Sequence, residues 1–506
     1  MQFGRIELFT DVEEVTKENI ADILRSVMPT HETNAASIKA LLDYECGDQR
    51  NFRTKTYRPE IDNWCVDNVA NEIADFKLSY NWGNPITLVM RDKEKGVNKG
   101  MSKAVSMLNR FYSEQEYEAK QQDLARFIEI CGIGYTFVDL NVDYEEGESP
   151  FTIDVLNPQC TFIVKSSYYL DKRPMAAVTY FCDNSGNKTY TCFTNKQRFE
   201  LNSSLEHLER SGEANPLGII PIVEWIRSYD RMGCFERQIS EMDNLNLLVS
   251  DFVNDVEQNT QAVWHTNDVE FPKVVVQKED GSKTETTVTP KKNEWMQTFT
   301  SQDGKTPFVK PLVIDYDYTG MLNNIITRRT LILQKCNVPQ RNDNSGGSTG
   351  IAMSDATGWT QAEVEATRQD QIKSACKLRE IKVVLRAIEK CPDFPKNSPV
   401  LKLKASDVKA SIKRQKTYEM TTKINAYATG VSHGINYKDM LCAINLFDDP
   451  QQVAENSEET TKAYLDSVFK VNENKPEGGA DEKAPNSDRL EQDKSDQVNN
   501  SPSMNG

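Results

Sequence analysis

A helical run between residues 234 and 263 constrains the fold of this chain more than any other stretch. At 1.5 Å per residue it would be about 45 Å long, which is too long to be buried inside one compact domain. Its apolar residues recur at heptad spacing, and acidic residues occupy other positions. The heptad residues are Phe235, Met242, Val249 and Val256, and the acidic residues include Glu241, Asp251 and Asp255. This pattern predicts one face that packs against a protein neighbour, although an amphipathic helix on an ordinary core is an open alternative.

Composition narrows the classes of function. The chain has 506 residues and a formal net charge of −16, which argues against a protein that grips nucleic acid over a broad basic face. Its 11 cysteines are scattered and never form a C-x-x-C pair, which indicates reduced thiols and no zinc framework. The N-terminus has no basic start followed by an apolar run, and no apolar stretch reaches membrane-spanning length. We therefore expect a soluble protein without an export signal.

The part of the chain before the helical run predicts an α+β unit. Helices are expected at 12–27, where Pro29 stops the helix, at 35–45, from Pro59 to the break at 81–85, and at 114–130. Beyond the glycine-bearing turn 131–134 the period changes to two. Strands of one antiparallel sheet are expected at 135–142, 151–155, 161–164, 176–181 and 189–193, with a hairpin turn at 183–187.

The part after the helical run predicts a small β unit between two helices. Residues 273–276 and 284–288 flank a hairpin turn, and 318–337 returns as a helix. A Gly- and Ser-rich loop at 340–358 follows, after which a capping box of Thr360 and Glu363 starts a helix over 362–390. Residues 406–469 are helical in pattern, with helices at 411–429 and 437–444. From about residue 471 the chain is polar and acidic, and we expect it to be disordered.

Motifs for catalysis or metal binding are mostly missing from the sequence. The four histidines are far apart, and none stands in an H-E-x-x-H arrangement, so we expect no metal site. The loop at 340–358 lacks the Gly-Lys-Ser/Thr ending of a phosphate-binding loop. A solvated hairpin tip explains the carboxylates of 143–148 better than a cation site does. We therefore expect no enzyme activity and no cofactor.

Several segments, taken in order, resemble portal proteins of tailed double-stranded-DNA bacteriophages, of the long-tailed siphophage type. These segments are 63–68, 75–77 with Tyr80, 83–87, 131–135, the Asn157-Pro158 step, 215–224 and 446–450. The order of helix, β insertion, helix, loop and long helix is similar to the stem, clip, stem, tunnel loop and wing helix of that family. The resemblance covers residues 35–469.

This resemblance implies an α+β portal fold with an α/β wing, a helical stem, a small β-rich clip, a helical crown and a disordered C-terminal tail. The implied parts are an N-terminal segment (1–34), the wing (35–232), the first stem helix (233–263), the clip (264–317), the second stem helix (318–338), the tunnel loop (339–358), the long wing helix with its connection (359–405), the crown (406–470) and the tail (471–506). The helical run of 234–263 would then be one stave of a barrel.

The resemblance also implies a structural protein that conducts DNA. Portal subunits form a closed ring, dodecameric in the assembled particle, at one capsid vertex of the virion, and they assemble in the bacterial cytoplasm with the scaffold and major capsid proteins. The clip would bind the terminase large subunit and later the head-completion or adaptor proteins, and Asp280, Gly281 and Trp295 are its candidate contact residues. No membrane takes part. Another ring or collar component of the virion is the alternative, but it should lack a clip between two stem helices.

Genomic double-stranded DNA would pass through this ring. The acidic residues Glu241, Asp251 and Asp255 would repel its phosphates over roughly one Debye length, about 8 Å at physiological salt, so that DNA slides. The heptad residues Phe235, Met242, Val249 and Val256 would form the seam between subunits. The tunnel loop would project toward DNA and hold it against back-slip. Its candidate residues are Asn342, Asn344, Ser345, Gly346, Gly347, Ser348 and Thr349.

Overall fold

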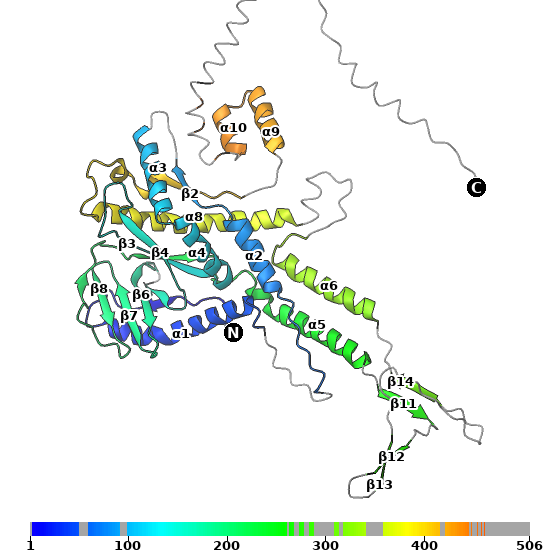
Figure 1. The fold of residues 1–506 in the computed structure, drawn as a ribbon. Helices are drawn as coiled ribbons and strands as arrows, with labels where there is room; N and C mark the ends of the chain where they lie inside the picture. The colour runs from blue at the N-terminus through cyan, green and yellow to red at the C-terminus, as the bar shows by residue number, and fades with distance from the viewer. Residues whose placement is uncertain are drawn as a thin grey trace, which may run out of the picture. The chain divides into compact units, whose positions relative to one another are not determined.

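The structure is a computed structural model of the chain (Figure 1). It describes residues 3–49, 59–91, 99–168, 170–260, 263–267, 273–277, 283–287, 308–312, 317–340, 358–414 and 420–444, with the single residues 447, 453, 457 and 460. The chain divides into two compact units, Met1–Lys416 and Thr417–Gly506, which are described separately. The first unit mixes helices and strands, as expected of an α+β protein.

The first helix, α1 (Ile20–Glu45), continues through Pro29. The sequence predicted two helices separated by this proline, and that prediction was wrong. Pro29 removes one helix hydrogen bond, which costs about 3 kcal/mol in a helix interior. Apolar residues continue one buried face on both sides of it, from Ile23 and Leu24 to Ile38 and Leu41, and their burial outweighs the cost.

Helix α1 covers a sheet with the strand order β1-β5-β6-β7-β8-β9. The strands are β1 (Leu8–Thr10), β5 (Thr161–Ser166), β6 (Pro174–Cys182), β7 (Lys188–Phe193), β8 (Gln197–Leu201) and β9 (Glu213–Ala214). β1 is parallel to β5, and the other pairs are antiparallel. The predicted hairpin turn between β6 and β7 is confirmed, because the Asp183 carboxylate accepts hydrogen bonds from the backbone N–H groups of Ser185 (2.8 Å) and Asn187 (2.7 Å).

A second sheet has the order β10-β3-β4, so the predicted strands do not form one sheet. Its strands are β3 (Ile133–Leu140), β4 (Phe151–Leu156) and β10 (Ile222–Ile226). Helices α4 (Tyr117–Cys131) and α8 (Trp359–Lys390) pack against it, and α3 (Lys99–Glu114) packs against α4. Gly132 ends α4 at φ 80°, where a Cβ would lie 2.4 Å from the carbonyl oxygen of Arg231. Only glycine fits this turn from helix into strand.

A short ladder of β2 (Thr87–Met90) and β15 (Val408–Ser411) completes this part of the first unit. It lies beside α8 and the short 3-10 helices η2 (Pro399–Lys402) and η3 (Ala405–Asp407). The sequence placed the start of the helical crown at residue 406, but this segment ends in a strand of the first unit. Val408 and Ala410 are buried and alternate with exposed Lys409, which is the period of a strand. The second unit begins only at Thr417.

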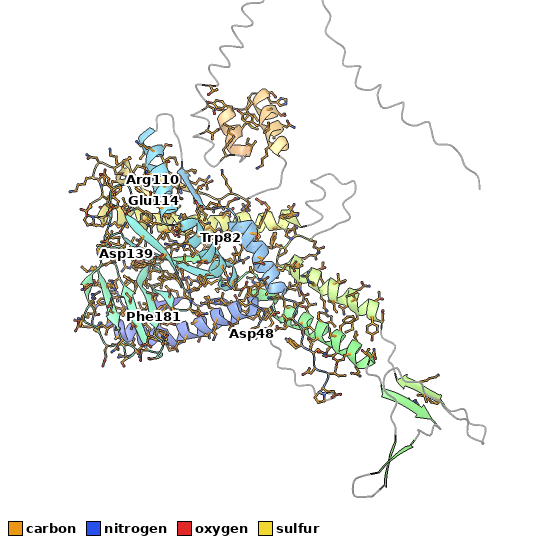
Figure 2. The ribbon with its side chains drawn as sticks, in the orientation of Figure 1. Asp48, Trp82, Arg110, Glu114, Asp139 and Phe181 are labelled. Atoms are coloured by element: carbon orange, nitrogen blue, oxygen red, sulfur yellow. The ribbon has the colours of Figure 1, made fainter. Side chains whose placement is uncertain are left out.

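The helix predicted after Pro59 begins later than expected. Residues 61–68 are not helical, and α2 (Val69–Trp82) starts after Asn68, whose side chain accepts a hydrogen bond from the backbone N–H of Asn71 (3.2 Å). At the other end of α2, Trp82 is buried, with its ring 6.3 Å from that of Trp225 on β10 (Figure 2). This contact anchors α2 to the second sheet.

Two helices, α5 (Ile239–Thr260) and α6 (Tyr318–Lys335), pack against each other. Between them in sequence lie two ladders, β11 (Val263–Asn267) with β14 (Phe308–Leu312), and β12 (Lys273–Gln277) with β13 (Lys283–Thr287). The predicted order of helix, small β unit and helix is therefore present. Helix α5 has 22 residues and is about 33 Å long, because the residues before it form the 3-10 turn η1 (Glu236–Gln238).

The second unit contains α9 (Met420–Ser432) and α10 (Tyr437–Ile444) among its described residues. The predicted bounds of α10 are confirmed, whereas the predicted helix 411–429 begins only at Met420. A Cβ at Gly430 would lie 2.3 Å from Cε of Met440, so glycine allows the two helices to approach closely. The tail at 471–506 lies outside the described residues.

His31 on α1 gives a pH-dependent prediction. Its ring lies 4.2 Å from that of Phe162, its Nε2 lies 3.2 Å from the Tyr180 hydroxyl, and burial lowers its pKa from 6.5 to about 4. The unfolded chain therefore takes up a proton at a higher pH than the folded chain. The contribution of His31 to the free energy of unfolding is fully present above pH 6.5. It is lost as the pH falls toward 4, which lowers the free energy of unfolding by about 3 kcal/mol in total.

Urea unfolding of the wild type and of His31→Gln between pH 4 and 7 measures this effect. The variant should lose this part of the pH dependence. Parallel stability curves for the two proteins would show that His31 does not carry it.

Candidate functional site

An extended segment, residues 61–68, lies along α5 and is held by side chains of that helix. Asn246, Ser250 and Asn254 stand four residues apart on one buried face of α5. They accept hydrogen bonds from alternate backbone N–H groups, with Asp67 bonded to Asn246 (2.9 Å), Cys65 to Ser250 (3.0 Å) and Asn63 to Asn254 (2.8 Å). The two spacings match, because four residues rise about 6 Å along a helix and two residues about 6.6 Å along an extended chain. This face of α5 therefore binds a segment of its own chain.

The predicted heptad seam of α5 divides into a buried part and an open part. Phe235 and Met242 are fully buried in a core shared with α1 and α2. Val249 packs against the same core and is half-buried, whereas Val256 is 44% exposed. The predicted seam is corrected accordingly: Phe235 and Met242 have no surface left for a neighbouring subunit.

The predicted acidic residues of α5 are partly exposed. The Glu241 side chain is 43% exposed and lies 3.7 Å from Arg328 and 3.8 Å from Lys335, both on α6. Asp251 and Asp255 are half-buried. The positive charges of Arg328 and Lys335 partly neutralise the Glu241 carboxylate. The negative electrostatic field of Glu241 is therefore weaker than the sequence alone suggested.

Helix α6 leaves large apolar side chains uncovered on two sides. Leu322 and Ile326 share one face and are 47% and 53% exposed. Leu331, which is 46% exposed, lies about 140–180° further round the helix. With Val256 of α5, these residues define the exposed stem surface (Val256, Leu322, Ile326 and Leu331).

The segments on either side of residues 341–357 are joined to each other through one buried ammonium group. Lys77 of α2, with a side chain 3% exposed, lies 2.5 Å from Oε2 of Glu365 on α8. It also donates to the carbonyl oxygen of Asn337, just after α6 (3.4 Å), and the Asn337 side chain donates to Glu365 (3.1 Å). The end of α6 and the start of α8 are therefore held together at one point of the first unit.

A chain of buried charges continues from Glu365 toward α4 and the second sheet. Arg227, just after β10, lies 2.5 Å from Glu365 and 2.9 Å from Glu129 on α4. Burial would raise the pKa of Glu129, but the cations of Arg227 and Lys373 outweigh it and hold that pKa below its usual value. Burial lowers the pKa of Lys373 to about 8, and its ammonium lies 4.1 Å from the centre of the Trp82 ring. The network links α2, α4, α8 and the residue that follows β10 through buried charged groups.

The start of α8 differs from the predicted capping box of Thr360 and Glu363. The N-cap is Gly358 at φ 88°, and no side chain caps it. The Glu363 carboxylate instead accepts a hydrogen bond from the Tyr80 hydroxyl. Trp359 packs edge-on against the rings of Phe76 (5.9 Å) and Tyr80 (5.6 Å). An aromatic cluster therefore fixes this end of the helix.

Two groups of predicted site residues lie outside the described residues. They are Asn342, Asn344, Ser345, Gly346, Gly347, Ser348 and Thr349 of the loop, and Asp280, Gly281 and Trp295 of the clip. Residues 346–350, which have the letters of the G-x-S-x-G elbow of some hydrolases, also lie outside the described residues. Among the described residues, no group of His, Cys, Asp and Glu could hold a metal ion.

The family model of the phage portal proteins, described as SPP1 Gp6-like, matches residues 31–464. The chain belongs to this phage portal family. The resemblance seen over residues 35–469 is thereby confirmed. No curated protein matches the chain. Within its described residues, none of the portal's helices is both long and apolar enough to cross a membrane.

Membership gives this portal its general role. Portal proteins are structural components of the virion capsid that connect the phage head to the tail and serve genome packaging. They act as homo-oligomeric rings, typically dodecamers, that interact with the capsid and with DNA. The first described unit of this portal contains the two larger sheets and the helix pair α5 and α6.

Proposed function

We propose that this portal forms a closed ring at one capsid vertex, through which the terminase packages genomic DNA and from which the DNA is later ejected. The family match is the observation that carries this proposal. The ring would assemble in the bacterial cytoplasm with the scaffold and major capsid proteins. ATP hydrolysis would belong to the terminase large subunit, and the portal itself would be no enzyme.

The exposed stem surface supports a ring built from lateral contacts. A closed ring needs heterologous interfaces, so each subunit must offer two different faces to its two neighbours. Leu322 and Ile326 lie on one side of α6 and Leu331 on another, which fits a stave between two neighbours. Val249 and Val256 would extend this contact along α5, while Phe235 and Met242 stabilise the subunit itself.

The passage of DNA would depend on charge and on the loop. Glu241, Asp251 and Asp255 would keep phosphates from binding to the stem. The loop around 342–349 would reach toward DNA, and its two ends are held to the wing through Lys77. The clip, with Asp280, Gly281 and Trp295, would bind the terminase and later the head-completion proteins.

Deleting residues 345–349 tests the role of the loop. We expect rings and procapsids to form normally, because the deletion lies between the two held ends, while the number of DNA-filled heads falls. Counting filled and empty heads by electron microscopy measures this effect. An equal deletion at 497–501 is the control and should leave filling unchanged. Normal filling with the loop deletion would refute the proposed contact with DNA.

A further inference from the structure

Residues 3–10 run along the wing and end in β1, which pairs with β5. They precede the residues that the family model matches, which begin at residue 31, so the family assignment does not explain them. Their partners come from four segments that are distant in sequence, namely α1, the end of α4, β5 and the turn from β10 into η1. The segment therefore joins parts of the wing to the root of the stem.

Arg5 makes the most deeply buried contact of this segment. Its guanidinium lies 2.5 Å from Oε1 of Glu236, the first residue of η1, and both side chains are 0% exposed. The same carboxylate accepts hydrogen bonds from the backbone N–H groups of Gly4 (2.7 Å) and Gly233 (2.8 Å). Without Arg5 and Gly4, Glu236 would be a buried charge with far weaker compensation.

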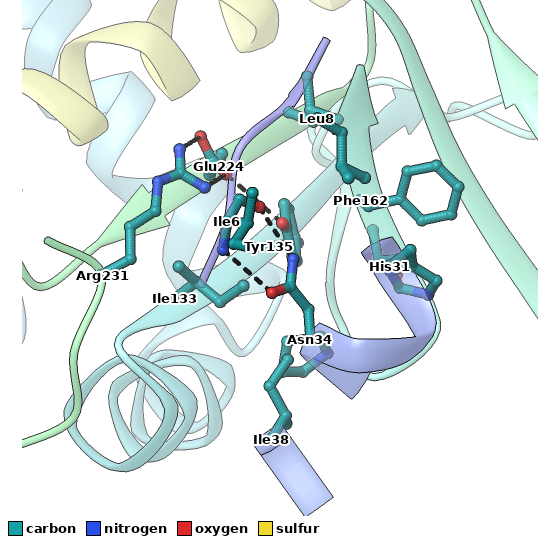
Figure 3. Close-up of a pocket in the computed structure, with 13 residues that line it drawn as sticks. Ile6, Leu8, His31, Asn34, Ile38, Ile133, Tyr135, Phe162, Glu224 and Arg231 are labelled. Atoms are coloured by element: carbon teal, nitrogen blue, oxygen red, sulfur yellow. Dashed lines mark hydrogen bonds and ion pairs between the residues drawn. The ribbon is translucent and has the colours of Figure 1, made fainter. Parts of the chain in front are cut away.

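The backbone of the segment is recognised as well as its side chains. The Asn34 amide accepts from the N–H of Ile6 (3.0 Å) and donates to its carbonyl oxygen (2.9 Å), as a neighbouring strand would (Figure 3). Gly4 has φ 72°, and a Cβ there would lie 2.4 Å from the carbonyl oxygen of Asp230. The site therefore selects an extended chain in which a glycine precedes an arginine.

A second set of ion pairs holds the middle of the segment. Glu7 lies 2.6 Å from Lys165 of β5 and 2.9 Å from Arg231, which pairs with Glu224 of β10 (2.8 Å, Figure 3). The cavity left beneath the segment is about 10 Å³, lined by residues that include Ile6 and Glu224, and has room for about one water molecule. The segment therefore fills its site almost completely.

We infer that the cleft between α1, β5 and η1 is a binding site for a short extended peptide with a Gly-Arg pair, and that residues 3–10 of the chain occupy it as a strap. The strap ties Glu236 and Gly233, at the root of α5, to Asn34 of α1 and Lys165 of β5. The core around α8 and the second sheet contains no residue of the strap. Loss of the strap should loosen the stem root and leave that core intact.

A cut made after folding tests this inference in the full-length chain. A protease site is inserted between Glu13 and Glu14, which are both exposed, and the folded protein is cleaved so that only non-covalent contacts hold fragment 1–13. Gel filtration over a dilution series then gives the Kd of the fragment. We expect Arg5→Met to raise this Kd at least about 30-fold, since it strips a fully buried carboxylate of its partner. Phe3→Ala, on the same segment but 56% exposed, should change it by no more than about threefold.

Hydrogen exchange shows whether the strap holds the stem root. When the fragment has left, exchange should become faster at residues 233–242 and stay unchanged at residues 376–388 of α8. If Arg5→Met does not fold before cleavage, Arg5→Lys retains the charge on a shorter reach and should give an intermediate Kd. The inference is overturned if the wild-type fragment dissociates at once, if the Arg5 variant binds as tightly as the wild type, or if exchange at 233–242 does not change.

Discussion

Glu380→Ala is expected to destabilise the first unit by about 3–5 kcal/mol, because it breaks a buried ion pair by removing one partner. Glu380 on α8 is fully buried and lies 2.6 Å from the Lys377 ammonium. Its carboxylate also accepts hydrogen bonds from Tyr112 (3.1 Å), Tyr117 (3.0 Å) and Thr136 (3.1 Å). The substitution leaves three buried hydroxyl groups without this acceptor and Lys377 without its carboxylate.

The buried Lys377 makes the loss of stability in Glu380→Ala especially large. Its ammonium lies 3.8 Å and 4.0 Å from the ring centres of Tyr112 and Tyr117, and its side chain is 1% exposed. Burial lowers the pKa of Lys377, and Glu380 opposes that shift. Without Glu380, the lysine must either hold an uncompensated charge or release its proton.

Urea unfolding at fixed protein concentration measures the effect. Glu380→Gln keeps hydrogen-bonding oxygen and nitrogen atoms in place and should be destabilised less than Glu380→Ala. Glu389→Ala on the same helix is the matched control, because that side chain is 56% exposed, and it should change stability by less than about 0.5 kcal/mol. A Glu380→Ala protein as stable as Glu389→Ala would contradict the network described for α8.

Ile326→Asp is expected to prevent ring formation while leaving the subunit folded. Ile326 is 53% exposed on α6, so a carboxylate there remains in water in a single subunit. In the proposed ring the same carboxylate would be buried without a partner, at a cost of several kcal/mol for each interface. Because each subunit contributes to two interfaces, the cost recurs around the ring. Analytical ultracentrifugation should show monomers or small oligomers.

The control for Ile326→Asp is Phe181→Asp. Phe181 lies on β6, far from α6 in sequence, and is 71% exposed (Figure 2). The Phe181→Asp substitution also changes a large apolar side chain to a carboxylate, but on the six-stranded sheet, and should leave the oligomer unchanged. Normal rings from Ile326→Asp would exclude this face of α6 from the subunit interface.

Elements with strong local periodicity could be predicted from the sequence. The long helix expected at 362–390 is α8 (Trp359–Lys390), and α10 has its predicted bounds. Failures occurred where distant contacts decide the local structure. Pro29 is accommodated because α1 buries one face on both sides of it. Residues 61–68 are extended because polar side chains of α5 bind their backbone.

The candidate site was harder to predict because it is formed by contacts between residues that are distant in sequence. Lys77 and Glu365 are 288 positions apart, and Arg5 and Glu236 are 231 apart, so no local pattern reports either ion pair. One signal was present in the sequence: Asn246, Ser250 and Asn254 place polar residues at four-residue spacing on an otherwise amphipathic helix. Such a polar stripe predicts a partner other than water, although its identity comes only from the structure.

We propose above all that this chain closes into a ring with a channel. The most direct test is the native mass of the purified protein, together with negative-stain images of the same sample. A dodecamer of 57.5 kDa subunits would have a mass of about 690 kDa and appear as rings with a central opening. A monodisperse 57.5 kDa monomer at high concentration, unchanged by the scaffold and capsid proteins of the same phage, would contradict the account.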